Sequence, residues 1–388
     1  MSGGPIPGKG ADMTGIEARF RLDWPGFLLD VDLSLPLSGV SALYGASGSG
    51  KTTLLRCIAG LERAPAGRLF VNGEVWQDEG CWVPPHKRPL GYVFQEASLF
   101  PHLTVIDNLL YGMRRVHDAP RVSLRQAIEL LGIGHLLGRK PDRLSGGERQ
   151  RAAIARALAV SPRLLLMDEP LASLDEPRKL EIMPYLEALR DEARIPIVYV
   201  SHSVAEVARL SDTLVILEAG RVRACGPTVE LMQRLDLVPA AGTGEAGALI
   251  EARVEAHDDA YGLTTLVSRG GTWRVPRLEA AAGKTVRMQI KARDVMIALE
   301  RPGAMSALNV IEAVVAEIGP MDAPGVEIRL DAKGEALVAR LTRYSAERLA
   351  LRVGTPVFAV VKSVSFGRES LGATWRNIRA ADAGAGRV

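Results

Sequence analysis

The sequence predicts an α/β domain followed by a smaller β-rich domain, and three observations lead to this fold class. Residues from about 16 to 233 alternate strand-like apolar runs with helical stretches, which is typical of an α/β domain. A stretch rich in Ala and Gly, 237–247, then interrupts the alternation as a linker would. Beyond it the chain changes to short alternating strands separated by glycine turns, the pattern of a small barrel.

The composition is that of a soluble globular protein. The chain has 388 residues, enough for two or three domains, and 47% of them are hydrophobic and 24% charged. A net charge of +3 is too small to argue for nucleic acid as the main partner. No run of about 18 apolar residues is present, so the sequence predicts no membrane-spanning helix. Residues 1–12 are rich in Gly and Pro and lack an apolar segment, so we expect disorder there and no signal peptide.

A glycine-rich loop between an apolar run and a helix-like segment has the spacing G-x-x-x-x-G-K-[ST] of a phosphate-binding loop. It comprises Gly45, Ala46, Ser47, Gly48, Ser49, Gly50, Lys51 and Thr52, and the helix-like segment continues from Thr53. Glycines let the backbone wrap a phosphate, and amides at the helix start point at the anion. We expect Lys51 to reach the β- and γ-phosphates of a nucleotide and the Thr52 hydroxyl to bind Mg²⁺. The alternative, a glycine-rich turn that binds nothing, does not explain the strand and helix on either side.

Two acidic residues end a second strand-like run, 164–167. Asp168 at the strand tip can hold Mg²⁺, directly or through water. Glu169 beside it can polarise an attacking water. A solvated acidic turn is the alternative, but the phosphate-binding loop in the same chain favours the nucleotide site.

The heptapeptide Leu144–Gln150, LSGGERQ, resembles the signature sequence of ATP-binding-cassette (ABC) proteins. Ser145 and the amides of Gly146 and Gly147 stand at the start of a predicted helix that runs to about Leu158, which again suits an anion. The resemblance implies that this helix tip completes the nucleotide site of the opposite subunit. Catalysis would then need a head-to-tail homodimer, with ATP and Mg²⁺ as its cofactors.

Further parts of the ABC pattern follow in order. Gln95 resembles the glutamine that binds Mg²⁺ and senses the membrane partner, and Asp175 lies in the loop that crosses the dimer interface. His202 resembles the switch histidine that contacts the γ-phosphate; without this context it would be an ordinary strand-end histidine. The family stacks adenine on an aromatic residue upstream of the phosphate loop, for which we choose Trp24, with Phe27 second.

The ABC resemblance covers about residues 16 to 240 and predicts a helical subdomain over 98–144. Residues 100–105 follow the importer-type pattern, which implies a surface for the coupling helix of an integral-membrane permease. The competing class is a soluble mechanical ATPase that acts on nucleic acid or ribosomes. Its members carry two cassettes or a long coiled-coil insertion, whereas this chain has one cassette and no sustained heptad run.

The C-terminal part contains an internal repeat in which three short segments recur in the same order. The matching pairs are 250–254 with 311–315, 273–278 with 336–341, and 283–286 with 354–357. Each copy is a β-rich unit of a size that suits a small barrel.

Residues from about 306 to 366 resemble the molybdate-binding (Mop) barrel, of the OB-like Mop/TOBE type, found in molybdate-importer ATPase subunits. In that family oxyanions bind through backbone amides, hydroxyls and an ammonium group, a donor set that suits a tetrahedral dianion. The corresponding residues are Ser306, Asn309, Lys362 and Ser363. Leu308 stands where the motif often has arginine, which should weaken oxyanion binding. A ligand-binding role and a purely structural, dimer-forming role for the barrel both remain open.

Together the resemblances imply the ATPase subunit of a bacterial molybdate importer. A homodimer would sit under permease subunits on the cytoplasmic face of the inner membrane, and a periplasmic oxyanion-binding protein would deliver the substrate. Alternatives are another cargo (tungstate, sulfate, ferric ion or sugar) or an oxyanion-responsive regulatory protein. The expected segments are 1–12, disordered; 13–240, the ABC domain; 241–304, linker and first β-rich unit; 305–372, the Mop-like domain; and 373–388, a disordered tail.

Overall fold

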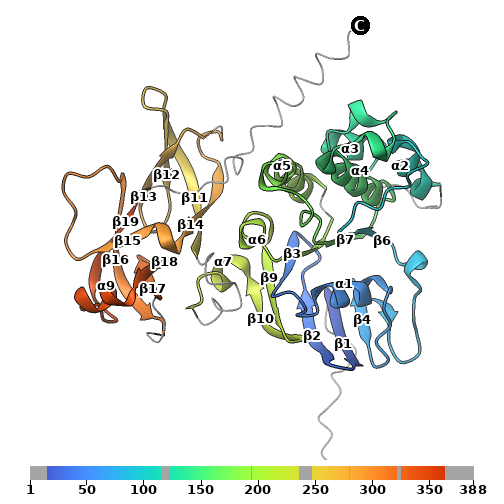
Figure 1. Cartoon of the computed structure of the whole chain (residues 1–388), viewed down its shortest axis with the longest axis horizontal. Coiled ribbons are helices and arrows are strands. Elements are labelled where there is room, and N and C mark those ends of the chain that lie inside the picture. Colours follow the sequence, from blue (N-terminus) through green and yellow to red (C-terminus); the bar gives the residue numbers. More distant parts are fainter. Residues whose placement is uncertain are drawn as a thin grey trace, which may run out of the picture.

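The computed structural model describes residues 15–114, 122–193, 195–235, 247–278, 280–320 and 325–362. Figure 1 shows an α/β part with its helices and large sheet, and beside it a β-rich part built from the C-terminal strands. The predicted disordered ends, 1–12 and 373–388, lie outside the described residues, as does the predicted linker apart from Gly247. In the described residues, no helix is long and apolar enough to cross a membrane.

A ten-stranded sheet forms the centre of the α/β part, in the order β5-β4-β1-β2-β10-β9-β3-β8-β7-β6. The strands are β1 (Ile16–Trp24), β2 (Phe27–Leu35), β3 (Val40–Tyr44), β4 (Arg68–Val71), β5 (Glu74–Gln77), β6 (Leu90–Val93), β7 (Leu164–Asp168), β8 (Ile197–Val200), β9 (Thr213–Glu218) and β10 (Arg221–Pro227). Neighbours among β9, β3, β8, β7 and β6 pair in parallel, whereas β1 pairs antiparallel with β2 and β4. The parallel strands β3, β7 and β8 are buried along their whole length, as continuous apolar runs in a covered sheet should be.

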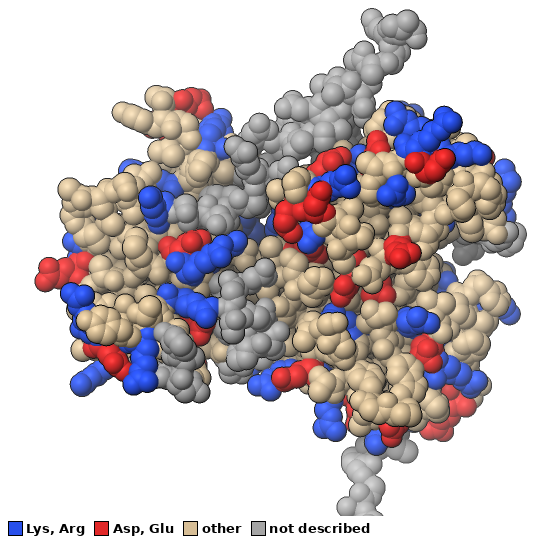
Figure 2. Space-filling view, viewed as in Figure 1, with Lys and Arg blue, Asp and Glu red and all other residues tan. Residues whose placement is uncertain are grey.

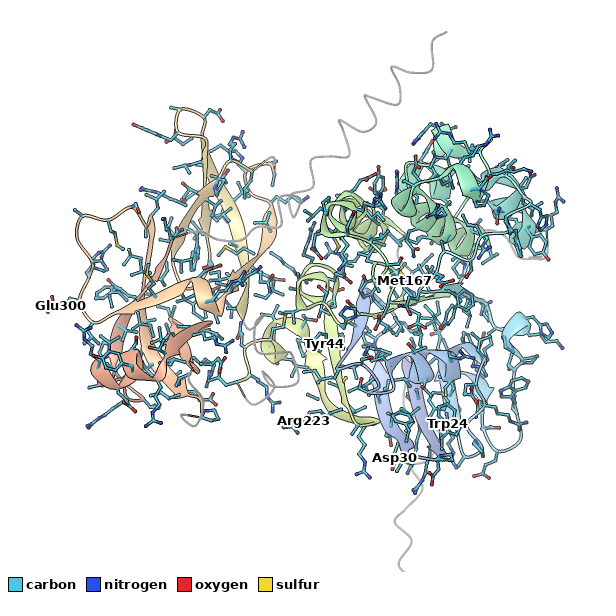
Figure 3. All side chains as sticks on the ribbon, viewed as in Figure 1. Trp24, Asp30, Tyr44, Met167, Arg223 and Glu300 are labelled. Atoms are coloured by element: carbon cyan, nitrogen blue, oxygen red, sulfur yellow. The ribbon has the colours of Figure 1, made fainter. Side chains whose placement is uncertain are left out.

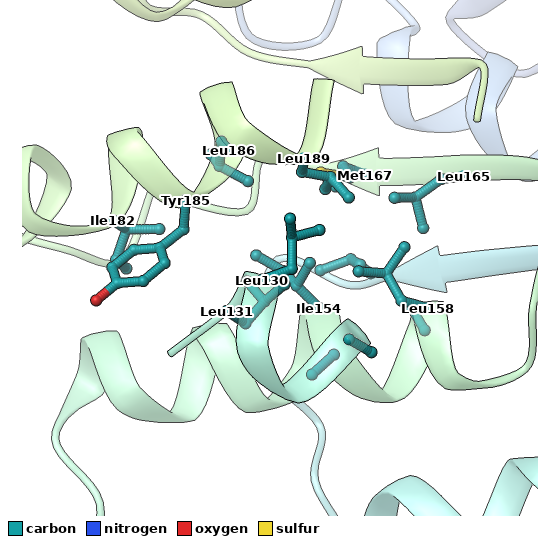
Figure 4. Packing of buried hydrophobic residues seen from close by; sticks show 14 of the residues in the cluster. Leu130, Leu131, Ile154, Leu158, Leu165, Met167, Ile182, Tyr185, Leu186 and Leu189 are labelled. Atoms are coloured by element: carbon teal, nitrogen blue, oxygen red, sulfur yellow. The ribbon is translucent and has the colours of Figure 1, made fainter. Parts of the chain in front are cut away.

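Helices cover this sheet and form a separate layer beside it (Figure 1). They are α1 (Lys51–Ala59), α2 (Val105–Met113), α3 (Leu124–Leu130), α4 (Gly146–Ala159), α5 (Glu176–Glu192), α6 (Val204–Leu210) and α7 (Thr228–Leu231), with 3-10 turns η1 (Pro85–Lys87), η2 (Gly134–Leu136) and η3 (Pro141–Arg143). The predicted helical subdomain contains α2 and α3, and the predicted signature helix is α4. One buried cluster joins them to the sheet: Figure 4 shows Leu158 of α4 close to Leu165 of β7, with Leu189 of α5 nearby. The signature helix is therefore anchored to the strand that carries the predicted acidic pair.

The C-terminal strands form two sheets whose strand orders correspond. The order is β13-β12-β11-β14 in the first unit and β18-β17-β16-β19 in the second, which adds β15 next to β19. The elements are β11 (Gly247–Asp258), β12 (Leu263–Val267), β13 (Thr272–Pro276), β14 (Thr285–Lys291), η5 (Ala292–Asp294), β15 (Val295–Ala298), β16 (Asn309–Ile318), β17 (Gly325–Ala332), β18 (Glu335–Thr342), α9 (Arg343–Arg348) and β19 (Pro356–Val361).

Local details of the two units also match. The pairing register shifts just after Val254 in β11 and just after Val315 in β16. In each unit a glycine amide donates to that valine's carbonyl, from Gly283 and from Gly354, both at 2.8 Å. The predicted internal repeat is thereby confirmed at the level of pairing, bulge and turn.

The two units share one hydrophobic core instead of folding around separate ones. The cluster includes Ile250, Trp273 and Val286 from the first unit and Ile311, Ile328 and Leu337 from the second. Strand β15 lies before residue 305 yet pairs with β19, so the expected division between 304 and 305 runs through a sheet. The repeat predicts a unit of small-barrel size for each copy, and in the structure the apolar faces of the two units pack against each other in this one cluster.

A fragment comparison tests this shared core. We expect a fragment of residues 241–388 to unfold in one cooperative thermal transition, and a fragment of residues 305–388 to lack one. The shorter fragment loses β15 and exposes core side chains, each worth about 1.5–3 kcal/mol when buried. Circular dichroism melts of both fragments are the measurement. Equal midpoints would show that the second unit folds alone.

The β-rich part contacts the α/β part through an arginine of β14. Arg287 donates from Nη2 to Asp212 Oδ1 (2.9 Å) and from Nη1 to the carbonyl of Ser211 (3.2 Å). Asp212 also accepts, through Oδ2, the amide of Val40 at the start of β3 (3.0 Å). On the face shown in Figure 2, Lys and Arg side chains are interspersed with Asp and Glu over both parts.

Candidate nucleotide-binding site

Four adjacent parallel strands bring the predicted nucleotide residues to one edge of the sheet. The phosphate loop follows β3, Asp168 and Glu169 end β7, His202 follows β8, and Gln95 follows β6. Because β3, β8, β7 and β6 are consecutive in the sheet and run the same way, their carboxyl ends meet. Figure 3 labels Tyr44 at the end of β3 and Met167 in β7, the two strands that flank β8 in the sheet order.

The phosphate loop adopts a backbone that requires glycine at three positions. Gly45, Gly48 and Gly50 have φ of 154°, 80° and 100°. A Cβ added to Gly45 would lie 2.2 Å from the carbonyl oxygen of Leu217, and one added to Gly50 would lie 2.9 Å from the Phe27 ring. The loop is therefore packed closely between β9 and the β1–β2 hairpin, and side chains at Gly45 and Gly50 would not fit there.

Lys51 opens helix α1 and turns its ammonium group back over the loop. Its Nζ donates to the carbonyls of Gly45 (2.8 Å) and Ala46 (2.9 Å), and lies 4.0 Å from Glu169 Oε1. The residue is only 5% exposed, and burial lowers its pKa. A positive charge is thus held between the loop and β7, where the phosphates of a nucleotide would need it.

Asp168 is fixed through both of its carboxylate oxygens. Thr52 Oγ1 donates to Oδ1 (2.8 Å) and the Tyr92 hydroxyl donates to Oδ2 (3.1 Å). Burial raises the pKa of Asp168 and also that of Tyr92, so that Tyr92 remains a proton donor. The adjacent hydroxyl and carboxylate oxygens are ligands of the kind Mg²⁺ prefers, and Gln95, exposed at the end of β6, can add a carbonyl oxygen. The donor set therefore fits Mg²⁺.

Glu169 has an unusual backbone and lies next to His202. Its φ is 43°, in the left-handed region that costs a non-glycine residue free energy, and its amide donates to the carbonyl of Val200 (3.1 Å). Its Oε2 lies 3.3 Å from His202 Nδ1. One carboxylate thus faces both Lys51 and His202, while its side chain remains 19% exposed and able to contact water.

The aromatic residues proposed for adenine lie beside the loop. Trp24 ends β1 and Phe27 begins β2, and their ring centroids are 6.2 Å apart. Phe27 packs next to Gly50, and Trp24, labelled in Figure 3, is 39% exposed, which suits stacking on a ligand ring. The two candidates for adenine stacking are therefore neighbouring rings.

The signature residues form a helix tip at which Ser145 is exposed and Gly147 is buried. Ser145 caps α4: its Oγ accepts from the amide of Glu148 (3.2 Å), whose carboxylate accepts from the amide of Ser145 (2.7 Å). Gly146 and Gly147 begin the helix, and a Cβ on Gly146 would lie 3.1 Å from Leu174. Asp175, the residue after Leu174, is the N-cap of α5. In the described part of the chain, the hydrogen bonds of Ser145 stay within its own helix turn and do not reach the phosphate loop.

The predicted oxyanion residues have different environments. Ser306, Leu308 and Lys362 are exposed, and the pairing of Asn309 with Val361 brings their two segments together at one end of the β16–β19 ladder. Ser363 lies outside the described residues.

Asn309 departs from the expectation that it donates to an oxyanion. It is 2% exposed, its Oδ1 accepts from the amide of Arg274 (2.7 Å), and its Nδ2 donates to the carbonyl of Arg274 (3.1 Å). The side chain therefore pairs with the β13 backbone and joins the two units. Sequence resemblance could not show this, because Arg274 lies 35 positions away.

Sequence reasoning also missed two polar groups that support the site. The Tyr92 hydroxyl reaches Asp168 only because β6 and β7 are neighbours, 76 positions apart in the chain. Glu206 is buried in the first turn of α6, close after His202. The spacing of motifs gives no signal for either group, since each depends on which elements pack together.

Comparison with known proteins agrees with this geometry. The model of the ABC transporter family matches residues 28–172, and that of the TOBE domain matches residues 305–366. A molybdenum import ATP-binding protein, ModC, from Methylococcus capsulatus is 59% identical over 354 residues, covering 91% of this chain and 99% of that protein. ModC 1 from Azotobacter vinelandii is 56% identical over 355 residues, covering 90% and 98%. ModC from Aromatoleum aromaticum is 56% identical over 375 residues, covering 94% and 99%. The chain therefore belongs to the ABC transporter family, in the group of molybdenum import ATP-binding proteins.

Proposed function

We propose that the chain is the ATP-hydrolysing subunit that energises molybdate import through an ABC permease complex. The observation that carries this proposal is the meeting of Lys51, Thr52, Asp168, Glu169 and His202 at one sheet edge. The identity to molybdenum import proteins over nearly their whole length supports the cargo.

Different side chains have different roles in ATP hydrolysis. The loop amides and Lys51 bind the phosphates of ATP, and the ring of Trp24 or Phe27 stacks on the adenine. Thr52, Asp168 and Gln95 would hold Mg²⁺, which would supply positive charge to the phosphate oxygens. Glu169 accepts a proton from the attacking water, and His202 lies where it can orient Glu169 and contact the γ-phosphate.

The nucleotide site is complete only in a homodimer under this proposal. The signature tip at Ser145 is exposed and unengaged with its own loop, so it is available to the loop of a second copy. Permease subunits would bind the helical layer of each copy, which places the homodimer on the cytoplasmic face of the inner membrane. A periplasmic oxyanion-binding protein would act on the other side, without contacting this chain.

Stimulation of ATP hydrolysis by cargo tests the whole assignment. The chain is reconstituted with its permease and with a binding protein loaded with molybdate, tungstate or sulfate. We expect molybdate loading to raise ATP turnover the most. A larger response to sulfate or to no oxyanion would contradict molybdate as the cargo, and no ATP turnover in any condition would contradict the enzyme assignment.

Mixing two inactive variants tests the composite site. Ser145→Arg disrupts the signature and Lys51→Ala disrupts the phosphate loop. A mixed dimer therefore retains one intact site, built from the loop of the first variant and the signature of the second, whereas neither homodimer retains any. We expect the mixture to turn over more ATP than the two variants measured separately, with turnover per chain rising with protein concentration. Turnover per chain that stays constant on dilution of the wild type would contradict the head-to-tail dimer.

A gain-of-function change tests the oxyanion role of the β-rich part. Leu308 is 50% exposed, so arginine fits there without loss of core, and it returns a charged donor next to Lys362. We expect Leu308→Arg to tighten molybdate binding by about ten- to a hundredfold, the effect of a charged hydrogen bond. Isothermal titration of the full-length variants with molybdate and sulfate is the measurement. Met305→Arg, also on an exposed side chain of this segment, is the control for added charge.

A further inference from the structure

Glu206 is a buried acid that the nucleotide site described above does not use. It is 6% exposed in the first turn of α6. Burying a carboxylate is costly unless its oxygens are well paired. Here Oε2 accepts hydrogen bonds from the Tyr199 hydroxyl (2.8 Å) and the Ser201 hydroxyl (2.7 Å), and Oε1 lies 3.6 Å from Lys179 Nζ. The carboxylate is therefore the centre of a closed polar cluster.

This cluster holds the residues on both sides of His202. Ser201 donates its hydroxyl to Glu206 and accepts, through the same oxygen, the amide of Ser203 (3.0 Å). Ser203 in turn accepts the amide of Glu206 on its own hydroxyl (3.3 Å). His202 is thus carried on a three-residue segment whose ends are both tied to Glu206, while the imidazole itself remains free to face Glu169.

The same carboxylate reaches the segment expected to cross the dimer interface. Lys179 of α5 contacts Glu206 and also Glu176 (3.1 Å), and its amide donates to the carbonyl of Asp175 (2.9 Å). Asp175 is the N-cap of α5. The first turn of α5 and the first turn of α6 therefore share one buried anion.

We propose that Glu206 is a positioning residue for ATP hydrolysis. It fixes the conformation of the segment that carries His202 and holds this segment in place relative to the start of α5. It contacts neither the phosphate loop nor Asp168; it acts on His202 through Ser201 and Ser203, and on the Asp175 segment through Lys179. The inference rests on the proposed ATPase function. It adds a residue whose loss affects turnover and leaves nucleotide binding intact.

Glu206→Gln in the full-length protein tests the role. The amide keeps the shape but has one acceptor oxygen in place of two and no charge, so the ion pair with Lys179 is lost whichever way the amide is turned. We expect kcat to fall by about tenfold, with the dissociation constant for ATP unchanged. Ser201→Ala, which removes the hydroxyl that links Glu206 to the amide of Ser203, should lower kcat severalfold. The double variant should be no slower than Glu206→Gln, because both changes break one connection.

Glu187→Gln is the matched control. Glu187 is a second largely buried acid that links α5 to α6, through Arg209 Nη2 at 2.8 Å, but near the far end of α6 from His202. We expect it to lower the melting temperature as Glu206→Gln does and to keep the wild-type kcat below that temperature. A kcat loss equal to that of Glu206→Gln would show that any broken α5–α6 contact slows hydrolysis, and would overturn the proposal.

Other outcomes separate this inference from the proposed function. Wild-type kcat in Glu206→Gln or in Ser201→Ala overturns the positioning role, as does a double variant whose loss is the product of the two single losses. If Glu206→Gln does not fold, Ser201→Ala alone decides by the same kcat criterion. Absence of ATP turnover in the wild type would overturn the proposed function itself, whatever Glu206 does.

Discussion

Glu169→Gln is expected to bind ATP and hold it in a stable dimer while hydrolysing it about a hundred- to ten-thousandfold more slowly than the wild type. The glutamate lies between Lys51 and His202, and its partly exposed carboxylate is the base that we propose for the attacking water. The carboxamide has the same size and cannot accept the proton. The φ of 43° is equally strained for either residue, so the backbone cost of the site does not change.

Steady-state ATP turnover and gel filtration with and without ATP measure the two halves of this prediction. Glu129→Gln is the control, because Glu129 is an exposed acid on α3 whose partner is Arg125. We expect that control to keep wild-type turnover and to remain monomeric or dimeric as the wild type does. Wild-type turnover in Glu169→Gln would show that another group activates the water.

Lys51→Ala is expected to remove tight ATP binding. The change deletes the only ammonium group that contacts the phosphate loop in the described residues, and charged hydrogen bonds of this kind are worth about 1.5–3 kcal/mol each. Two such bonds to a triphosphate correspond to an affinity loss of at least about a hundredfold. Titration of a fluorescent ATP analogue measures the loss directly.

Lys87→Ala is the matched control for Lys51→Ala. Lys87 is an exposed lysine at the end of η1, so its removal changes the net charge equally and leaves the loop untouched. Because Lys51 also donates to two loop carbonyls, a thermal melt should accompany the titration to show that the variant is folded. An unchanged affinity in folded Lys51→Ala would mean that the nucleotide binds elsewhere.

The sequence predicted those parts of the site that are local in the chain. A phosphate loop, a strand tip with Asp168 and Glu169, and the helix start at Ser145 each depend on a few consecutive residues. Each appears where its spacing places it. The contacts of Tyr92 and Glu206 depend instead on which strands and helices become neighbours, and no spacing encodes that.

The β-rich part shows the same difference between local features, which the sequence predicts, and contacts between distant segments, which it does not. Repeat spacing predicted two corresponding β-rich units, and the structure adds that their strand orders match. It did not predict that the units would close over one core or that Asn309 would pair with the backbone of Arg274. Both depend on contacts between the units, which the alternation within each strand does not specify.

The contact of Arg287 with Asp212 has a consequence for where the two parts of the chain meet. Asp212 holds the first residue of β3, Val40, whereas the phosphate loop leaves the opposite end of that strand. The β-rich part thus contacts the α/β part at the beginning of β3, away from the sheet edge that carries the nucleotide residues. The contact between the two parts, which also includes the buried cluster of Leu235, Ala292 and Val338, is therefore separate from the surface on which hydrolysis depends.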